Sequence, residues 1–168
     1  MARVEQTDEE LRKWLVDAAE EHGAAVMHVE GDEHGAPFAF SVGVWRRFGR
    51  PEAVAIGLPP DVANAVINTY VQRSAAQERF VPGRLYEGFV QDCPVAVEKV
   101  AQPHYPEFLG SAFVVYGGPD FPAVQLIVPT PDGHFPWHQD APEGFAAYQP
   151  VLTESGMPES WIPGADGP

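Results

Sequence analysis

The stretch that decides the fold runs from Phe38 to Leu58 and reads FAFSVGVWRRFGRPEAVAIGL. Its first part alternates, with Phe38, Phe40, Val42 and Val44 on one face, which is typical of a half-buried strand. The loop WRRFGRP separates it from a second apolar run, EAVAIGL. The segment before it, AAVMHVE, is also strand-like and is joined by the turn GDEHGAP. Together these segments predict a three-stranded meander.

Two helices are expected on either side of the meander. Thr7 and Glu10 form a capping box, apolar residues follow at helical spacing, and Gly23 ends the pattern. This pattern predicts a helix over about residues 8–22. The segment PPDVANAVINTYVQRSAAQ, residues 59–77, has prolines at its start and one apolar stripe. It predicts the second helix.

The second half of the chain is rich in short apolar runs that predict further strands, over residues 84–91, 95–100, 111–117 and 123–129. One short helical turn is expected around residues 106–109. From Thr130 onward the chain is rich in proline and glycine, and we expect an irregular tail that packs onto the domain through its apolar residues. The elements predict an α+β fold with a curved antiparallel sheet or a small split-barrel-like core, two main helices and that tail.

Length and composition indicate one domain over residues 1–168, since 168 residues with 45% hydrophobic content can enclose a core without metal or disulfide. Cys93 is the lone cysteine, and no apolar run approaches the roughly 18 residues of a membrane span. The acidic opening lacks the apolar core of a signal peptide. We therefore expect a soluble, cytoplasmic protein. The formal net charge of -14 disfavours nucleic acid and anionic membranes as partners.

The segment HFPWHQD, residues 134–140, suggests a metal site because His138 and Asp140 have the spacing that opens a two-histidine, one-carboxylate iron triad. Such a triad needs a second histidine further along, and none follows His138. Pro136 prevents the helical spacing that would align His134 with His138. We therefore expect no metal here: Phe135 and Trp137 would pack into the core, while His138 and Asp140 would face solvent.

Polar and aromatic residues on strand ends and loops of the C-terminal half form one candidate ligand site. They would either line a pocket or rim an aromatic core. The set comprises His104, Tyr105, Tyr116, Gln125, Trp137 and His138.

Arginines of the middle segment form a second candidate site. Arg46, Arg47 and Arg84, with three further arginines nearby, would make a positive island for an anionic ligand such as a flavin nucleotide if folding brought them together. The alternative is that they are solvated partners of the many carboxylates.

Five segments, in this order, carry a resemblance to a known family: FAFSVGVWRRFGRPEAVAIGLPPDVANAVIN, FVPG, HYPEFLGSAFVVYGG, FPAVQLIVPTPDGHFPW and YQPVL. They cover about residues 20–152 and resemble a bacterial family catalogued as domain of unknown function 4262. No activity is assigned to that family, so the resemblance implies a soluble bacterial domain and supplies no catalytic residue. Where this chain has His138, the family pattern usually has an acidic residue, so the histidine is a local departure.

The function expected from the sequence is an accessory domain that binds a small ligand or a partner, without evident catalytic residues. Two alternatives remain open. One is a flavin-nucleotide-binding oxidoreductase or carrier of split-barrel type. The other is an acidic protein–protein module resembling an immunity protein, which the net charge would suit if its partner were basic.

Overall fold

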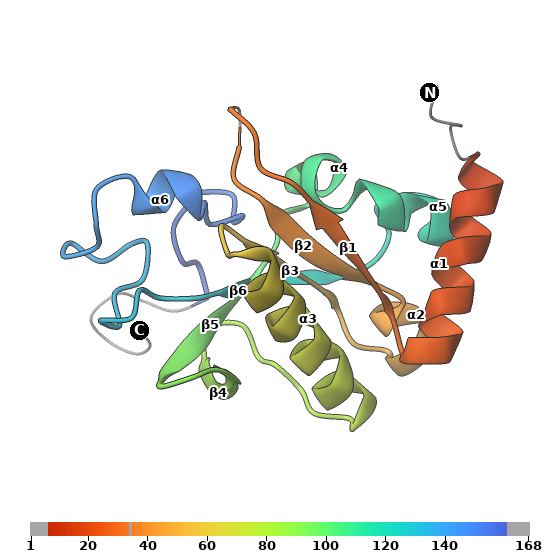
Figure 1. Ribbon diagram of the computed structural model, residues 1–168, viewed down its shortest axis with the longest axis horizontal. Coiled ribbons are helices and arrows are strands. Elements are labelled where there is room, and N and C mark those ends of the chain that lie inside the picture. Colours follow the sequence, from red (N-terminus) through yellow and green to blue (C-terminus); the bar gives the residue numbers. More distant parts are fainter. Residues whose placement is uncertain (1–6, 34, 161–168) are drawn as a thin grey trace.

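The computed structural model describes residues 7–33 and 35–160 (Figure 1). The helices are α1 (Asp8–His22), α2 (Val44–Phe48), α3 (Pro60–Ala75), α4 (Tyr105–Phe108), α5 (Phe113–Tyr116) and α6 (Phe145–Tyr148). The strands are β1 (Ala25–Val29), β2 (Phe38–Val42), β3 (Glu52–Ile56), β4 (Leu85–Val90), β5 (Cys93–Lys99) and β6 (Ala123–Ile127). Short 3-10 turns, η1 (Gln102–His104) and η2 (Gly110–Ala112), precede α4 and α5.

The strands form one six-stranded sheet in the order β1-β2-β3-β6-β5-β4. All neighbouring pairs are antiparallel except β3 and β6, which are parallel. The predicted α+β class with a curved sheet is confirmed, and the sheet is open and mixed. It is not a barrel because β1 and β4 are its two edges, whereas closure would require those strands to pair.

Each face of the sheet has its own apolar core. On one face α3 packs against alternate strand residues, among them Ala55, Val97 and Leu126. On the other face α1, α4 and α5 cover Phe40, Val54 and their neighbours. Figure 1 shows α1 and α6 at opposite ends of the molecule. On this second face, residues from the tail cover the β5–β6 side of the sheet, opposite to the side that α1 covers.

The helix α1 begins and ends as its sequence predicts. The Thr7 Oγ1 accepts the backbone N–H of Glu10 at 3.1 Å, and Gly23 ends the helix with φ 94°. Its packing against the start of α2 requires Gly43, which has φ 124°. A Cβ added there would lie 2.6 Å from the Ala19 Cβ, so any side chain at this position would push α1 away.

Two segments differ from the sequence-based expectation. Residues 111–117 were predicted as a strand, but they form η2 and α5, ended by Gly117 in the left-handed conformation. The reason is that FVVY is a continuous apolar run without alternation, and such a run packs equally well as one helical turn, here against α1. The second difference is α2, which begins at Val44, predicted as the end of a strand, and continues into the stretch predicted as a loop. Val44 therefore packs in the core on the α3 face and not with Phe40 and Val42. The short helical turn expected near residues 106–109 is confirmed as α4.

None of the helices within residues 7–33 and 35–160 is both long and apolar enough to cross a bilayer.

Candidate ligand-binding site

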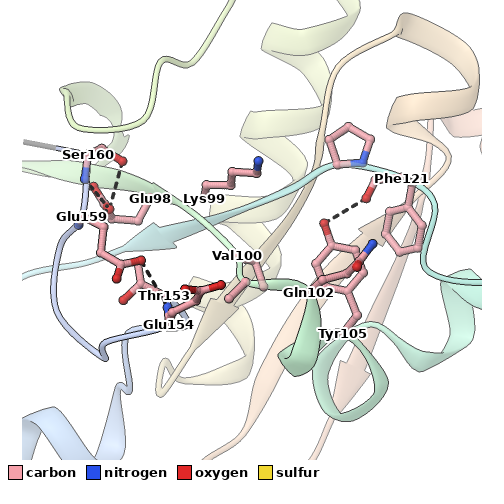
Figure 2. Close-up of a pocket in the computed structure, with 12 residues that line it drawn as sticks. Glu98, Lys99, Val100, Gln102, Tyr105, Phe121, Thr153, Glu154, Glu159 and Ser160 are labelled. Carbon is pink, nitrogen blue, oxygen red and sulfur yellow. Dashed lines mark hydrogen bonds between the residues drawn. The ribbon is translucent and has the colours of Figure 1, made fainter.

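A pocket of about 600 Å³ lies where β5 ends, between α4 and the segment 153–160 (Figure 2). Its lining comes from three parts of the chain that are distant in sequence: Glu98 to Gln102 with Tyr105, then Phe121 and Pro122, then Thr153, Glu154, Glu159 and Ser160. In Figure 2, Glu98, Glu159 and Ser160 form one side, and Gln102, Tyr105 and Phe121 form the other. We call these the carboxylate side and the aromatic side.

The sheet places a carboxylate in the wall of this pocket. Because side chains alternate along β5, Val95 and Val97 face α3, while Ala96 and Glu98 face the opposite side. Glu98 lies directly across from Gln125 of β6, and it is only 1% exposed. A charged residue so deeply buried must be compensated by hydrogen bonds or by a partner.

The segment 149–152 is fastened to the sheet by two glutamine side chains. The Gln125 amide donates to the Pro150 carbonyl at 2.8 Å and accepts from the Leu152 N–H at 2.8 Å. The Gln149 amide makes the same two kinds of bond with the backbone of Val128, at 2.7 and 2.9 Å. These side-chain amides take the place of the backbone hydrogen bonds that a further strand would make with β6. They thereby fix the position of Leu152, from which the segment 153–160 continues.

Glu98 holds the far end of that segment. Its Oε1 accepts from the Glu159 N–H at 2.9 Å, the Ser160 N–H at 3.2 Å and the Ser160 Oγ at 3.0 Å. Its Oε2 is buried and has no hydrogen-bond partner in the part of the chain that the structure describes. One oxygen of the carboxyl therefore shapes the pocket wall, while the other retains its full capacity to accept a donor.

The aromatic side is built on Tyr105 and Phe121, whose ring centroids are 5.0 Å apart. Burial raises the pKa of Tyr105, and its hydroxyl donates to the Phe121 carbonyl at 2.9 Å. At the mouth, the exposed Gln102 donates its amide N–H to the Pro119 carbonyl at 3.1 Å. Tyr105 and Phe121 are both buried, so this side presents only a small apolar surface to a ligand, with its donors already engaged.

Three of the residues predicted for a ligand site lie at or next to this pocket. Tyr105 lines it, Gln125 lies beside Glu98 and anchors the adjoining segment, and the His104 Nε2 is 3.3 Å from the Thr153 carbonyl oxygen. The other three predicted residues of the C-terminal half lie elsewhere. Trp137 packs in the cluster of Ala96 and Ile127, His138 lies against Phe135, and Tyr116 binds Glu52.

In the segment 134–140, Phe135 is buried, and Trp137 stacks on it with centroids 5.0 Å apart. The His138 Nδ1 accepts the Phe135 N–H at 2.9 Å, so this ring closes a local turn and is half-buried, while Asp140 is exposed. Among the described residues, no group of three or more His, Cys, Asp or Glu side chains could hold a metal ion.

The structure does not bring Arg46 and Arg84 together. Arg84 precedes Leu85, the first residue of β4. Leu85 pairs with Ala96 of β5, and Ala96 pairs in turn with Ile127, at the C-terminal end of β6. The Arg46 N–H donates to the Tyr116 hydroxyl, which donates to Glu52 at the start of β3. Glu52 pairs with Ala123, the first residue of β6, so Arg46 lies near the opposite end of that strand. Arg47 donates to the last carbonyls of α1, at Ala19 and Glu20. Arg47 therefore complements the dipole of that helix.

A second buried carboxyl, Glu52, lies at the start of β3. It accepts hydrogen bonds from the Ser41 and Tyr116 hydroxyls and from the N–H groups of Gly43, Val44 and Trp45. Burial raises its pKa, while those donors oppose the shift. Burial and the neighbouring carboxyl also raise the pKa of Tyr116. Because five donors surround Glu52, its role is to join β2, α2 and α5.

The sequence reasoning missed Glu98 and the acidic residues Glu154 and Glu159 of the tail. A signal for Glu98 was present: in the predicted strand VAVEKV it is a single carboxylate that follows alternating valines. A charged side chain at such a position either lies on an exposed face of the sheet or is buried with a partner that compensates its charge. No local signal marks the tail residues, because they join the pocket only through contacts distant in sequence.

The fold and the pocket define a small α+β domain with an open mixed sheet and a carboxylate-bearing cavity beside its C-terminal segment. The model of the family "Domain of unknown function (DUF4262)" matches residues 18–142, so the chain belongs to that family. The matched region includes Glu98, Tyr105 and Phe121 but ends before the wall formed by residues 153–160. No curated protein and no solved structure matches the chain.

Proposed function

We propose that this protein is a small-molecule-binding accessory domain whose ligand occupies the pocket between the end of β5, α4 and residues 153–160. The observation that carries the proposal is the buried, half-satisfied carboxyl of Glu98 in the wall of that pocket. Buried polar atoms rarely lack a hydrogen-bond partner, and an exception calls for an explanation such as a bound water, an ion or a functional role. Such a carboxyl within a cavity favours binding over a purely structural role.

The size and lining of the pocket support the same function. Its volume of about 600 Å³ falls within the range of about 300–1,000 Å³ that is typical of small-molecule sites. Its lining is mainly polar, with several convergent polar groups beside a small apolar contribution from Val100 and Phe121. The wall is also held firmly, because Gln125 fixes the segment that carries Thr153.

A fragment titration followed by amide chemical shifts tests this proposal. The set includes cationic, neutral and anionic fragments together with flavin mononucleotide. Fragments that bind are expected to shift the amides of residues 98–105 and 153–160. The variant Ala101→Phe, which adds a ring at the pocket wall, should abolish those shifts. The same substitution at the exposed Ala147 of α6 should preserve them.

Two outcomes would overturn the proposal. One is that no fragment shifts those amides. The other is that Ala101→Phe leaves the shifts unchanged, since the fragments would then bind elsewhere. If flavin mononucleotide instead shifts the amides around Arg46 or Arg84, the pocket is not the main site and an anionic ligand at the arginines is favoured.

A further inference from the structure

We infer that the ligand of this pocket carries a protonated amino group, which binds at the carboxylate side, and an apolar portion that lies against Tyr105 and Phe121. This inference rests on the proposed small-molecule function and specifies its chemistry. Three observations carry it: the charge of the lining, the use of its donors and the shape of the pocket.

The charge of the lining favours a cation. Glu98, Glu154 and Glu159 contribute three carboxylates, against the single ammonium group of Lys99. Glu98 is the carboxylate among them that is buried, and a buried charge attracts an opposite charge more strongly than an exposed one does. An anionic ligand would face repulsion at this side of the pocket.

The hydrogen-bonding groups of the lining favour a ligand that donates. Four side-chain donors already have acceptors: the Tyr105 hydroxyl, the Gln102 amide, the Thr153 hydroxyl and the Ser160 hydroxyl. The Glu98 Oε2, in contrast, is an acceptor without a donor in the described part of the chain. An ammonium group has three donors and a positive charge, so it can both donate to the Glu98 Oε2 and complement the negative charge of the lining.

The shape of the pocket separates the two ends of the ligand. In Figure 2, the carboxyl of Glu98 and the ring of Tyr105 lie on opposite sides, with Val100 between them. A ligand that reaches both is therefore extended, with the amine at one end and an apolar or aromatic body at the other. An aromatic body would pack against the rings of Tyr105 and Phe121.

Access to Glu98 involves the segment that it holds. Glu98 is 1% exposed, whereas Glu159 and Ser160, which donate to its Oε1, are both exposed. We therefore expect the ammonium to reach Oε2 by displacing the segment at Glu159 and Ser160, which weakens their bonds to Oε1. Binding should accordingly change the hydrogen exchange of the Ser160 N–H.

The test uses three probes with one carbon skeleton and different charges: 2-phenylethylammonium, 2-phenylethanol and phenylacetate. Calorimetry on the full chain at neutral pH is expected to show at least about tenfold tighter binding of the cation than of the alcohol, equivalent to about 1.4 kcal/mol. Phenylacetate should bind more weakly than the alcohol. The variant Glu98→Gln keeps an oxygen for the three donors at Oε1 and removes the charge, so it should abolish the preference for the cation.

Glu107→Gln is the matched control, because Glu107 is an exposed carboxylate of nearby α4 that does not line the pocket. It should change the affinity for the cation by less than about twofold, in keeping with the weak, screened effect of an exposed charge. Circular dichroism melts of both variants verify that they remain folded. If Glu98→Gln proves unstable, the ranking of the three probes on the unmodified protein still decides the inference.

The outcomes separate this inference from the proposal on which it rests. Equal binding of cation and alcohol in the pocket, or an unchanged preference in Glu98→Gln, would refute the amine and leave small-molecule binding intact. If all three probes fail to bind and no fragment of the wider set shifts the pocket amides, the proposed function itself is wrong.

Discussion

Replacing Gln125 with leucine should detach the segment that forms one wall of the pocket. The Gln125 side chain is buried and makes two bonds, to the Pro150 carbonyl and the Leu152 N–H, both at 2.8 Å. Leucine has a similar size but no polar atom, so both backbone groups would lose their partner. A buried group left in this way costs about 1–3 kcal/mol, and the half-buried Pro150 carbonyl can turn to water more readily. We therefore expect a loss of about 2–4 kcal/mol in the free energy of unfolding.

Urea melts of Gln125→Leu measure this loss, and hydrogen exchange of the Leu152 N–H locates it. The control is Gln72→Leu on the exposed face of α3, where the same substitution should stay within about 0.5 kcal/mol. A loss below about 1 kcal/mol, or an unchanged exchange rate at Leu152, would show that the segment is held by its apolar contacts and not by the amide.

Three further predictions concern the rest of the fold. Gly43→Ala should cost more than about 2 kcal/mol, since its Cβ would meet α1 at 2.6 Å, whereas Gly49→Ala, with open space around it, should cost only about 1 kcal/mol in the same melts. The raised pKa of Glu52 means that its contribution to stability is full below the ordinary pKa of 4.5 and is lost as the pH rises through the folded-state value. The stability of the parent protein relative to Glu52→Gln should therefore fall as the pH rises above 4.5, and a difference that rises instead would mean that the five donors keep the carboxylate ionised. Phe135→Ala should cost about 3–5 kcal/mol, more than Trp137→Ala, because Phe135 is buried and Trp137 is only half-buried; the reverse order in denaturant melts would mean that Trp137 is the anchor of this loop.

Local signals in the sequence were sufficient for most of the elements. The capping residue Thr7 and the terminal Gly23 fix the ends of α1. The alternation from Phe38 to Val42 identifies β2, although the structure buries both faces of this strand. The segment 111–117 shows where such signals fail, because an apolar run without polar residues has no period to read. Local patterns also do not predict which distant strands pair. No residue near β6 indicates that this strand inserts between β3 and β5.

The candidate site was predictable only in part, for the same physical reason. Tyr105 and Gln125 were identified because polar and aromatic residues at strand ends commonly serve ligands. The strand pattern marks Glu98 as a lone carboxylate, but its role follows only from its burial and its contacts with Glu159 and Ser160. Those contacts join residues more than sixty positions apart. The grouping of Arg46 with Arg84 had no local support either, and the register of the sheet places them apart.

A crystal structure of the protein with 2-phenylethylammonium bound would show directly whether Glu98 binds an amine. We expect the ligand to lie between β5, α4 and residues 153–160, with its nitrogen about 2.7–3.2 Å from the Glu98 Oε2 and its ring against Tyr105 and Phe121. A ligand found elsewhere on the molecule, or one lying in the pocket with its nitrogen turned away from Glu98 toward solvent, would contradict it.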